Sequence, residues 1–221
     1  MSAQGTFRHG DGPGFDLIET MRWEPQAGFV RFERHLARLY RSASALGFAC
    51  DPEHIGQTLT NAVGAAAVPL RVRLVLSPNG DVTVSTAPFE PLAAGKVWTL
   101  RIASARLDSA NPLVAHKTSR RATYMKARSE FQMHAADEVV LLNERGEVCE
   151  GTITNIFFGA GNGTLLTPAL ACGLLPGILR AELLDEDRAS EAVMNAADLM
   201  DGRDIFVGNS LRGLIPARLG S

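Results

Sequence analysis

The sequence has few lysines, few cysteines and little net charge. Arginine supplies most of its 22 basic residues, so any chemistry that needs a lysine amine has only three candidates. These are Lys96, Lys117 and Lys126. The three cysteines stand far apart and form no CxxC pattern, which argues against a disulfide scaffold or a zinc ribbon. A net charge of −2 excludes nucleic-acid binding through bulk charge.

Long apolar runs are also missing. No stretch of about 18 apolar residues occurs, so no membrane-spanning helix is expected. The lead from Met1 to Gly14 is polar and glycine-rich and has no signal-peptide core. We therefore expect a soluble, cytoplasmic protein. Its 221 residues, 46% of them hydrophobic, suit one compact unit or two small lobes.

The first half of the chain predicts strands and helices of an α+β lobe. Phe32 to Phe48 has apolar residues at helical spacing and a stop signal at Gly47. The other expected elements are a strand over 15–22, a helix over 52–67, a hairpin of 70–76 with 82–86, and a strand over 97–103. A second stripe on the first helix, His35, Arg38 and Ser42, is interpreted from periodicity alone as a solvated face.

The second half predicts a different pattern, and the composition changes near 104–110. We expect a smaller N-terminal lobe over 1–105 and a larger C-terminal lobe over 106–221. Pro176 and Gly177 should open a helix that runs to about Asp187. The other expected elements are helices over 119–133 and 196–200 and strands over 138–142, 148–158, 164–167 and 205–207, the last followed by a turn at 208–210.

Two backbone features favour anions. Leu175 to Leu179 leads into a helix N-terminus, where free N–H groups and the helix dipole attract phosphate. Gly208 to Ser210 is a small, hydroxyl-bearing turn after an apolar strand. Taken singly, each is more often an ordinary helix start or strand end.

Two ionisable residues are candidates for catalysis. Burial of Lys117 would lower its pKa and supply the neutral amine that carbonyl chemistry requires. Glu150 stands in an otherwise apolar strand. The alternatives are a surface lysine at a helix start and an edge-strand charge that faces water.

The order of these motifs resembles the class IV aminotransferase family, the fold-type IV pyridoxal-phosphate enzymes. The resemblance runs from about Phe15 to Pro216. It depends on the segments FDLIETMR, HLARLYRSASALGF, HKTSRRATY, DEVVLLNERGEVCEGTITNIFF, LLTPALACGLLPGILRAELL and VGNSLRGLIP. The sequences of these segments are most similar to those of the aminodeoxychorismate lyases of that family. The resemblance implies a two-lobed α+β fold like that of D-amino acid aminotransferase, in which the C-terminal lobe, 106–221, binds the cofactor.

The resemblance also implies cofactor contacts. Lys117 matches the lysine that binds the cofactor aldehyde as a Schiff base. Glu150, 33 residues later, matches the acid that keeps the pyridine nitrogen protonated, so that the ring can accept electrons from a carbanion. Arg38 matches the arginine that grips the cofactor phosphate.

Further cofactor contacts are implied at the two anion-favouring segments. Ile178 and Leu179 match backbone N–H donors to the phosphate, although many members have Thr where Leu179 stands. Ser210 matches a phosphate-binding Ser or Thr. Gly177 and Asn209 belong to the same segments, and Asn155 matches a recurrent asparagine assigned to site architecture.

Substrate contacts are expected from arginines. Thr20 and Arg22 share one face of the first strand. Thr at position 20 is typical of the lyases of the family, and Thr20 is counted with the catalytic residues. Arginines can pair with a substrate carboxylate. The candidates are Arg22, Arg71, Arg73, Arg121 and Arg212, with Arg106 and Arg120 as further possibilities.

Three functions remain open at this point. The first is a lyase that converts 4-amino-4-deoxychorismate to 4-aminobenzoate and pyruvate for folate synthesis. The second is an aminotransferase for branched-chain or D-amino acids, and the third is a cofactor-binding protein without turnover. The resemblance further implies a homodimer that acts on a small carboxylate-bearing molecule and has no metal site.

Overall fold

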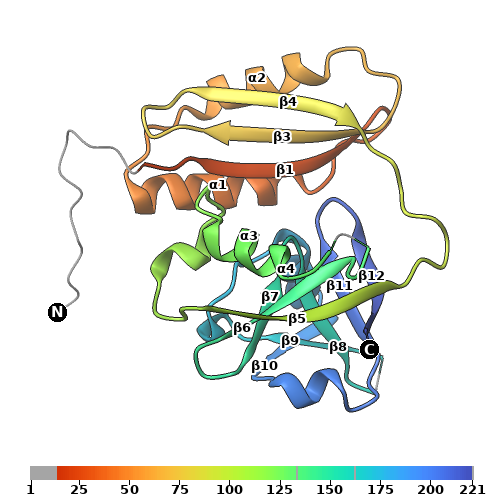
Figure 1. The fold of residues 1–221 in the computed structure, drawn as a ribbon. Coiled ribbons are helices and arrows are strands. Elements are labelled where there is room, and N and C mark those ends of the chain that lie inside the picture. The colour runs from red at the N-terminus through yellow and green to blue at the C-terminus, as the bar shows by residue number, and fades with distance from the viewer. Residues whose placement is uncertain (1–13, 133, 162, 221) are drawn as a thin grey trace. The chain divides into compact units, whose positions relative to one another are not determined.

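A computed structural model describes residues 14–132, 134–161 and 163–220, which form two compact units (Figure 1). The first unit comprises Met1–Glu90 and Lys117–Arg120, and the second comprises Pro91–His116 and Arg121–Ser221. The boundary expected at 105/106 falls inside a strand that belongs wholly to the second unit. The polar lead, apart from Gly14, lies outside the described residues, as do Met133 and Asn162.

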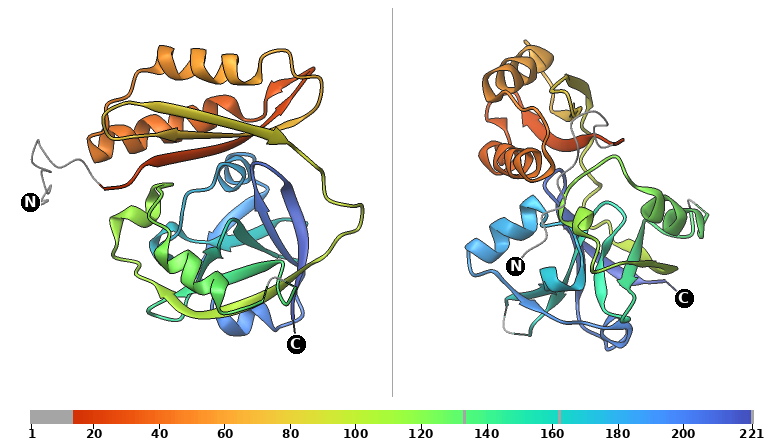
Figure 2. Two further views of the ribbon diagram at one scale, coloured as in Figure 1. Left: turned by 45° about the horizontal axis from the view of Figure 1, so that its top comes forward. Right: turned by 90° about the vertical axis from the view of Figure 1, so that its left-hand side faces the viewer.

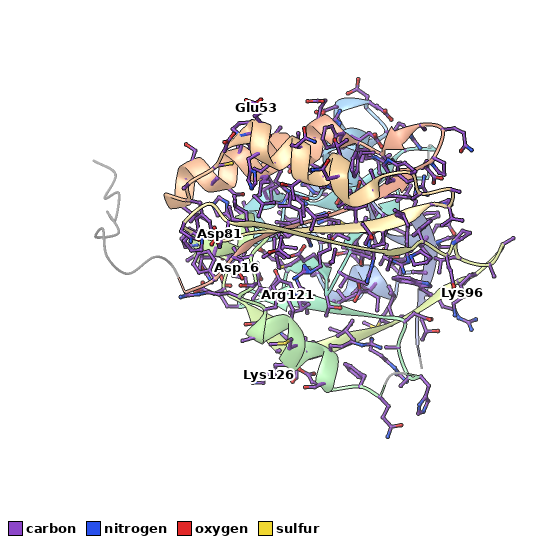
Figure 3. All side chains as sticks on the ribbon, turned by 90° about the horizontal axis from the view of Figure 1, so that it is seen from above. Asp16, Glu53, Asp81, Lys96, Arg121 and Lys126 are labelled. Carbon is purple, nitrogen blue, oxygen red and sulfur yellow. The ribbon has the colours of Figure 1, made fainter. Side chains whose placement is uncertain are left out.

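The first unit is a four-stranded antiparallel sheet in the order β2-β1-β3-β4 with two helices. Its elements are β1 (Leu17–Glu24), β2 (Gly28–Phe29), α1 (Phe32–Leu46), α2 (Pro52–Val63), β3 (Leu70–Leu76) and β4 (Val82–Pro88). Both helices lie on the same face of the sheet (Figures 1 and 2), where α1 packs on β1 and α2 packs on β3 and β4. Asp16 and Asp81 mark one end of this sheet (Figure 3).

Alternation along the strands explains this layering. In β3 the residues Leu70, Val72, Leu74 and Leu76 are buried, and the residues between them are more exposed. The expected hairpin and first helix are confirmed, and α1 ends at Gly47, which has a φ of 73°. The solvated stripe on α1 is wrong, because its three polar residues are buried against the sheet.

The second unit contains an eight-stranded sheet in the order β10-β9-β8-β11-β12-β5-β6-β7. A further pairing between β7 and β8 closes six of these strands into a ring. The strands are β5 (Trp98–Leu107), β6 (Glu138–Asn143), β7 (Val148–Gly151), β8 (Asn155–Gly159), β9 (Leu165–Pro168), β10 (Ala189–Ala192), β11 (Ile205–Asn209) and β12 (Gly213–Leu219). The helices are α3 (Ala122–Ser129) and α4 (Ile178–Asp185), with short 3₁₀ turns at Pro112–Ala115, Leu170–Cys172 and Ala196–Leu199.

The single strand expected over 148–158 is wrong, because the chain bends at Thr152–Thr154 and forms β7 and β8 instead. The buried carboxylate of Glu138 causes the bend. It accepts hydrogen bonds from the backbone N–H groups of Thr152 and Ile153 and from the hydroxyls of Thr152 and Thr154, at 2.6–3.1 Å. These bonds replace the cross-strand bonds that a continuous strand would need.

Three other expectations change. The helix expected over 119–133 is shorter, because Ser119 is bonded to Asp16 in the first unit; its expected end, Met133, lies outside the described residues. The strand expected over 205–207 continues to Asn209, so the turn begins later. Sequence reasoning also missed β10 and β12, the second of which contains Pro216.

No helix among the described residues is long and apolar enough to cross a membrane.

Candidate functional site

The segment that carries Lys117 lies along the edge of β1 in the first unit. Thr118 bridges to Leu17, and the carbonyl oxygen of Lys117 accepts a 2.8 Å bond from the N–H of Ile18. Lys117 is half-buried. The backbone of the candidate lysine is therefore anchored to a sheet strand, which limits its movement.

A buried ion network lies beneath β1. Glu19 is 1% exposed and binds the Arg38 guanidinium through two bonds, from Nε at 2.8 Å and from Nη2 at 2.7 Å. His35 Nδ1 lies 2.6 Å from Glu19 Oε2, the oxygen that also accepts from Arg38 Nη2. The spacing of His35 and Arg38 along α1, three residues apart, lets both reach the same carboxylate.

The charges of this network are well defined. Burial opposes ionisation of Glu19, but Arg38 and His35 outweigh it and lower the Glu19 pKa to about 2. Burial lowers the pKa of His35, and the positive charges of Arg38 and Lys117 act in the same direction, against Glu19. His35 is therefore a neutral imidazole whose Nδ1–H donates to an ionised carboxylate.

The candidate substrate residues of the first unit share the sheet face opposite the helices. Thr20 pairs with Arg73 and Arg22 pairs with Arg71 across β1 and β3, and directly opposed residues point to the same side. The Arg22 guanidinium lies over the Phe89 ring, 5.3 Å from its centroid, and its Nε is 3.0 Å from Glu24. This face therefore gathers three arginines that can bind carboxylates.

In the second unit, Glu150 is buried in β7 at 4% exposure. Its Oε1 accepts two hydrogen bonds, from the Tyr124 hydroxyl at 2.7 Å and from the Leu175 N–H at 3.2 Å. Glu150 is thus not the water-facing edge charge that its sequence context also allowed. Both donors converge on one oxygen of the carboxylate.

Asn155, on β8, holds the loop that contains Leu175 and leads into α4. It pairs with Glu150 where β7 and β8 close the ring, and its Nδ2 donates to the Leu175 carbonyl at 3.0 Å. A Cβ on Gly177 would lie 1.8 Å from Asn155 Oδ1, so only glycine fits at that position. The loop before α4 is therefore tied to the carboxylate of Glu150.

The two segments that favour anions meet in the second unit. Gly177 is the N-cap of α4 and offers no side-chain cap to the N–H groups of Ile178 and Leu179. A Cβ on Gly208 would lie 2.8 Å from the Leu179 side chain, so Leu179 packs tightly over β11 just before Asn209 and buried Ser210. Leu179 thus packs its apolar side chain against β11 at the position where many family members have a threonine hydroxyl.

Asn209 supports the neighbouring turns. Its Nδ2 donates to the Ile153 carbonyl at 3.1 Å, and its Oδ1 accepts from the Arg212 N–H at 3.0 Å. These bonds connect the bend at Thr152–Thr154 to the turn between β11 and β12. Arg212 follows Ser210 in that turn.

The other candidate arginines are dispersed. Arg121 begins the segment of α3 that also carries Lys126 (Figure 3), and its guanidinium lies 4.6 Å from the Tyr124 ring centroid and donates to the Thr152 carbonyl. Arg106 Nη1 donates to the carbonyls of residues 103–105 in its own strand. Arg120 lies over the Phe15 ring in the first unit.

Sequence reasoning missed Glu19, Tyr124 and Glu138. Glu19 binds Arg38 and Tyr124 binds Glu150, two residues that the motifs did identify. Glu138 holds the bend that follows Glu150. A charged or hydroxyl-bearing residue inside an apolar segment is the signal that could have found Glu19 and Glu138. Tyr124 lies within the quoted segment HKTSRRATY but gave no pattern of its own.

The chain matches the amino-transferase class IV family over residues 16–219. A Schizosaccharomyces pombe protein, provisionally named an aminodeoxychorismate lyase, is 34% identical over 203 residues, 89% of this chain and 86% of that protein. A crystal structure of a provisionally named amino-acid aminotransferase from Mesorhizobium loti is 62% identical, with a TM-score of 0.91 over 93% of this chain and 100% of that one. A provisionally named branched-chain aminotransferase from Thermotoga maritima is 25% identical, with a TM-score of 0.82 over 93% of this chain and 77% of that one.

The chain therefore belongs to the class IV aminotransferase family. It is a pyridoxal-phosphate-dependent enzyme of fold type IV, a lyase or an aminotransferase, and the expected fold class is confirmed. The residues present fit that cofactor chemically. The chain offers a lysine amine, a buried carboxylate held by two donors, and an uncapped helix N-terminus for a phosphate.

Proposed function

We propose that this enzyme is a lyase that converts 4-amino-4-deoxychorismate to 4-aminobenzoate and pyruvate. The observation that carries the proposal is the 34% identity to the S. pombe relative across most of both chains. The arginine-rich face of the first unit agrees with it, because that substrate has two carboxylates that need cationic partners. Folate synthesis is the process that this product would serve.

We propose specific roles for the chain's residues with pyridoxal phosphate as the cofactor. The cofactor, when bound, stores the electron pair released at the substrate carbon that carries the amine. Lys117 binds the cofactor and then takes the proton from that carbon as a general base. Glu150 holds a proton on the pyridine nitrogen, and Thr20 stands beside Arg73 on the substrate face.

The phosphate contacts follow from the second unit and from α1. The N–H groups of Ile178 and Leu179, next to Gly177, are proposed to bind the phosphate together with the Ser210 hydroxyl. Arg38 is proposed to contribute the positive charge of its guanidinium, which Glu19 holds in place. Asn155 and Asn209 hold the loops that present these donors.

An amino-acid aminotransferase is the second candidate, and a specific observation favours it. The M. loti structure that is 62% identical carries that provisional name. Lys117 and Glu150 suit both reactions, because each reaction passes through a carbanion next to the amine. The arginine-rich face of the first unit separates the candidates, since a branched-chain amino acid has one carboxylate and an apolar side chain.

The test is a product assay on the cofactor-loaded enzyme. With 4-amino-4-deoxychorismate we expect equal amounts of 4-aminobenzoate and pyruvate, and none from Lys117→Ala. Glutamate, D-alanine and leucine are supplied separately, and conversion of the cofactor to its amine form is followed by absorbance. Faster conversion by any of these amino acids than release of 4-aminobenzoate would overturn the lyase proposal.

We also propose that the enzyme is a homodimer, as the family resemblance implies. Light scattering across a range of protein concentrations tests this directly. A mass near 47 kDa, roughly twice the 23.7 kDa of one chain, is expected. A mass of one chain at every concentration would contradict the proposal.

A further inference from the structure

Tyr124 contacts the carboxylate of Glu150, the residue proposed to bind the pyridine nitrogen of the cofactor. Its hydroxyl donates to Glu150 Oε1 at 2.7 Å, and the backbone N–H of Leu175 donates to the same oxygen. Burial raises the pKa of Tyr124 far above its ordinary value, and the charge of Glu150 raises it further. Tyr124 therefore keeps its proton and donates a hydrogen bond to the Glu150 carboxylate.

Arg121 places the Tyr124 ring. Both belong to the same short helical segment, three residues apart, so their side chains lie on one face. The Arg121 guanidinium covers the ring at 4.6 Å and donates to the Thr152 carbonyl, two residues beyond Glu150. The order Arg121, Tyr124, Glu150 forms a continuous chain of contacts from α3 to β7.

We infer that Tyr124 is a positioning residue, held in place by Arg121, which orients the Glu150 carboxylate toward the cofactor's pyridine nitrogen. This inference rests on the proposed role of Glu150. Two donors on Oε1 set the plane of the carboxylate and limit its rotation in β7. Arg121 then acts through Tyr124, which differs from the substrate contact expected from the sequence.

The consequence for the cofactor is electrostatic. A donor on Oε1 stabilises the anionic carboxylate and limits its rotation, and an oriented anion holds a proton on the pyridine nitrogen best. Removal of the Tyr124 hydroxyl leaves a buried carboxylate with one donor fewer. The cofactor should then bind more weakly, and the nitrogen should lose its proton at a lower pH.

The experiment compares Tyr124→Phe with Tyr40→Phe. Tyr40, on α1, is the only other tyrosine in the sequence, so the two variants make the same chemical change in different units. Pyridoxal phosphate is titrated into each apo protein. We expect the Kd to rise about tenfold for Tyr124→Phe, as loss of one hydrogen bond to a charged group implies, and to stay within about twofold for Tyr40→Phe.

A second readout separates positioning from general stability. The visible absorption band of the loaded protein is recorded against pH, and its transition should shift by about one pH unit in Tyr124→Phe alone. Arg121→Ala should raise the Kd and shift the band transition as Tyr124→Phe does, but by smaller amounts. The double variant should resemble Tyr124→Phe, because both residues act on one carboxylate.

Each outcome has a defined meaning. An unchanged Kd and an unchanged band transition in Tyr124→Phe would overturn the inference. A lower melting temperature of the apo protein without a change in the band would assign Tyr124 a structural role and also overturn it. If Tyr124→Phe does not fold, Arg121→Ala decides between the same results. If wild type forms no borohydride-trapped adduct at Lys117, the proposed function fails instead.

Discussion

Glu150 and Asn155 face each other where β7 meets β8 and hold opposite ends of one residue, Leu175. Glu150 accepts from the Leu175 N–H at 3.2 Å, and Asn155 donates to the Leu175 carbonyl at 3.0 Å. The loop that leads into α4 is therefore held by the same strand pair that carries the candidate acid. If the proposed roles of Glu150 and the α4 N-terminus hold, the pyridine nitrogen and the phosphate are bound by parts of the second unit that are tied together.

This clamp predicts the effect of Gly177→Ala. The added Cβ would lie 1.8 Å from Asn155 Oδ1, so either the loop or the amide must move. We expect the Kd for pyridoxal phosphate to rise about tenfold or more, measured by absorbance titration. Gly56→Ala is the matched control, because its Cβ would meet no atom within 4 Å. Equal affinity of both variants would show that the clamp does not place the phosphate donors.

The buried Glu19 predicts a pH dependence of folding. Its pKa is lowered from 4.5 to about 2, so its contribution to the free energy of unfolding is complete above pH 4.5 and is lost as the pH falls toward 2. The shift corresponds to about 3 kcal/mol. Urea unfolding at several pH values should show this loss in wild type and a flatter profile in Glu19→Gln.

The control for that series is Glu90→Gln, an exposed carboxylate in the same unit. Its unfolding free energy should follow wild type within about 0.5 kcal/mol at every pH. If Glu19→Gln keeps the acid dependence of wild type, another group causes it and the account of the Glu19 network is wrong.

The bend between β7 and β8 predicts that Glu138→Gln is strongly destabilising. An amide would place N–H donors against the N–H and hydroxyl donors of Thr152–Thr154. Leaving such buried donors unpaired should cost about 3 kcal/mol in the free energy of unfolding. Glu186→Gln, at an exposed ion pair, should change it by less than about 0.5 kcal/mol. A Glu138→Gln protein as stable as the control would show that the bend needs no carboxylate.

The arginine-rich face predicts a binding defect in Arg73→Ala. Arg73 is paired across strands with Thr20, so its loss removes a cation beside the proposed substrate face. We expect KM for 4-amino-4-deoxychorismate to rise about tenfold or more with little change in kcat. Arg41→Ala, on the exposed side of α1, should leave KM unchanged. A fall in kcat at constant KM would place Arg73 in the chemistry rather than in binding.

Periodicity predicted the elements whose two faces differ. The apolar spacing of α1 and the alternation of β3 were sufficient to place both correctly. It failed where a distant side chain redirects the backbone. Glu138 breaks the expected strand at Thr152, although the two are 14 residues apart in the sequence.

The candidate site followed a similar division. Motif resemblance predicted roles for Lys117, Glu150 and the α4 N-terminus, each of which lies within one continuous motif of the sequence. It could not show that Arg38 is paired with Glu19 or that Tyr124 donates to Glu150, because those contacts join residues 19 and 26 positions apart. The buried polar stripe of α1 was mistaken for a solvated one, since its partner lies on another element.

The most direct test of the account is borohydride reduction of the pyridoxal-phosphate-loaded protein, followed by peptide mapping. We expect a visible absorption band that reduction removes, with the cofactor joined covalently to the peptide that contains Lys117. Lys117→Ala should show no such adduct, and Lys126→Ala should behave as wild type. A cofactor trapped on another lysine, or no band at saturating cofactor, would contradict the central assignment.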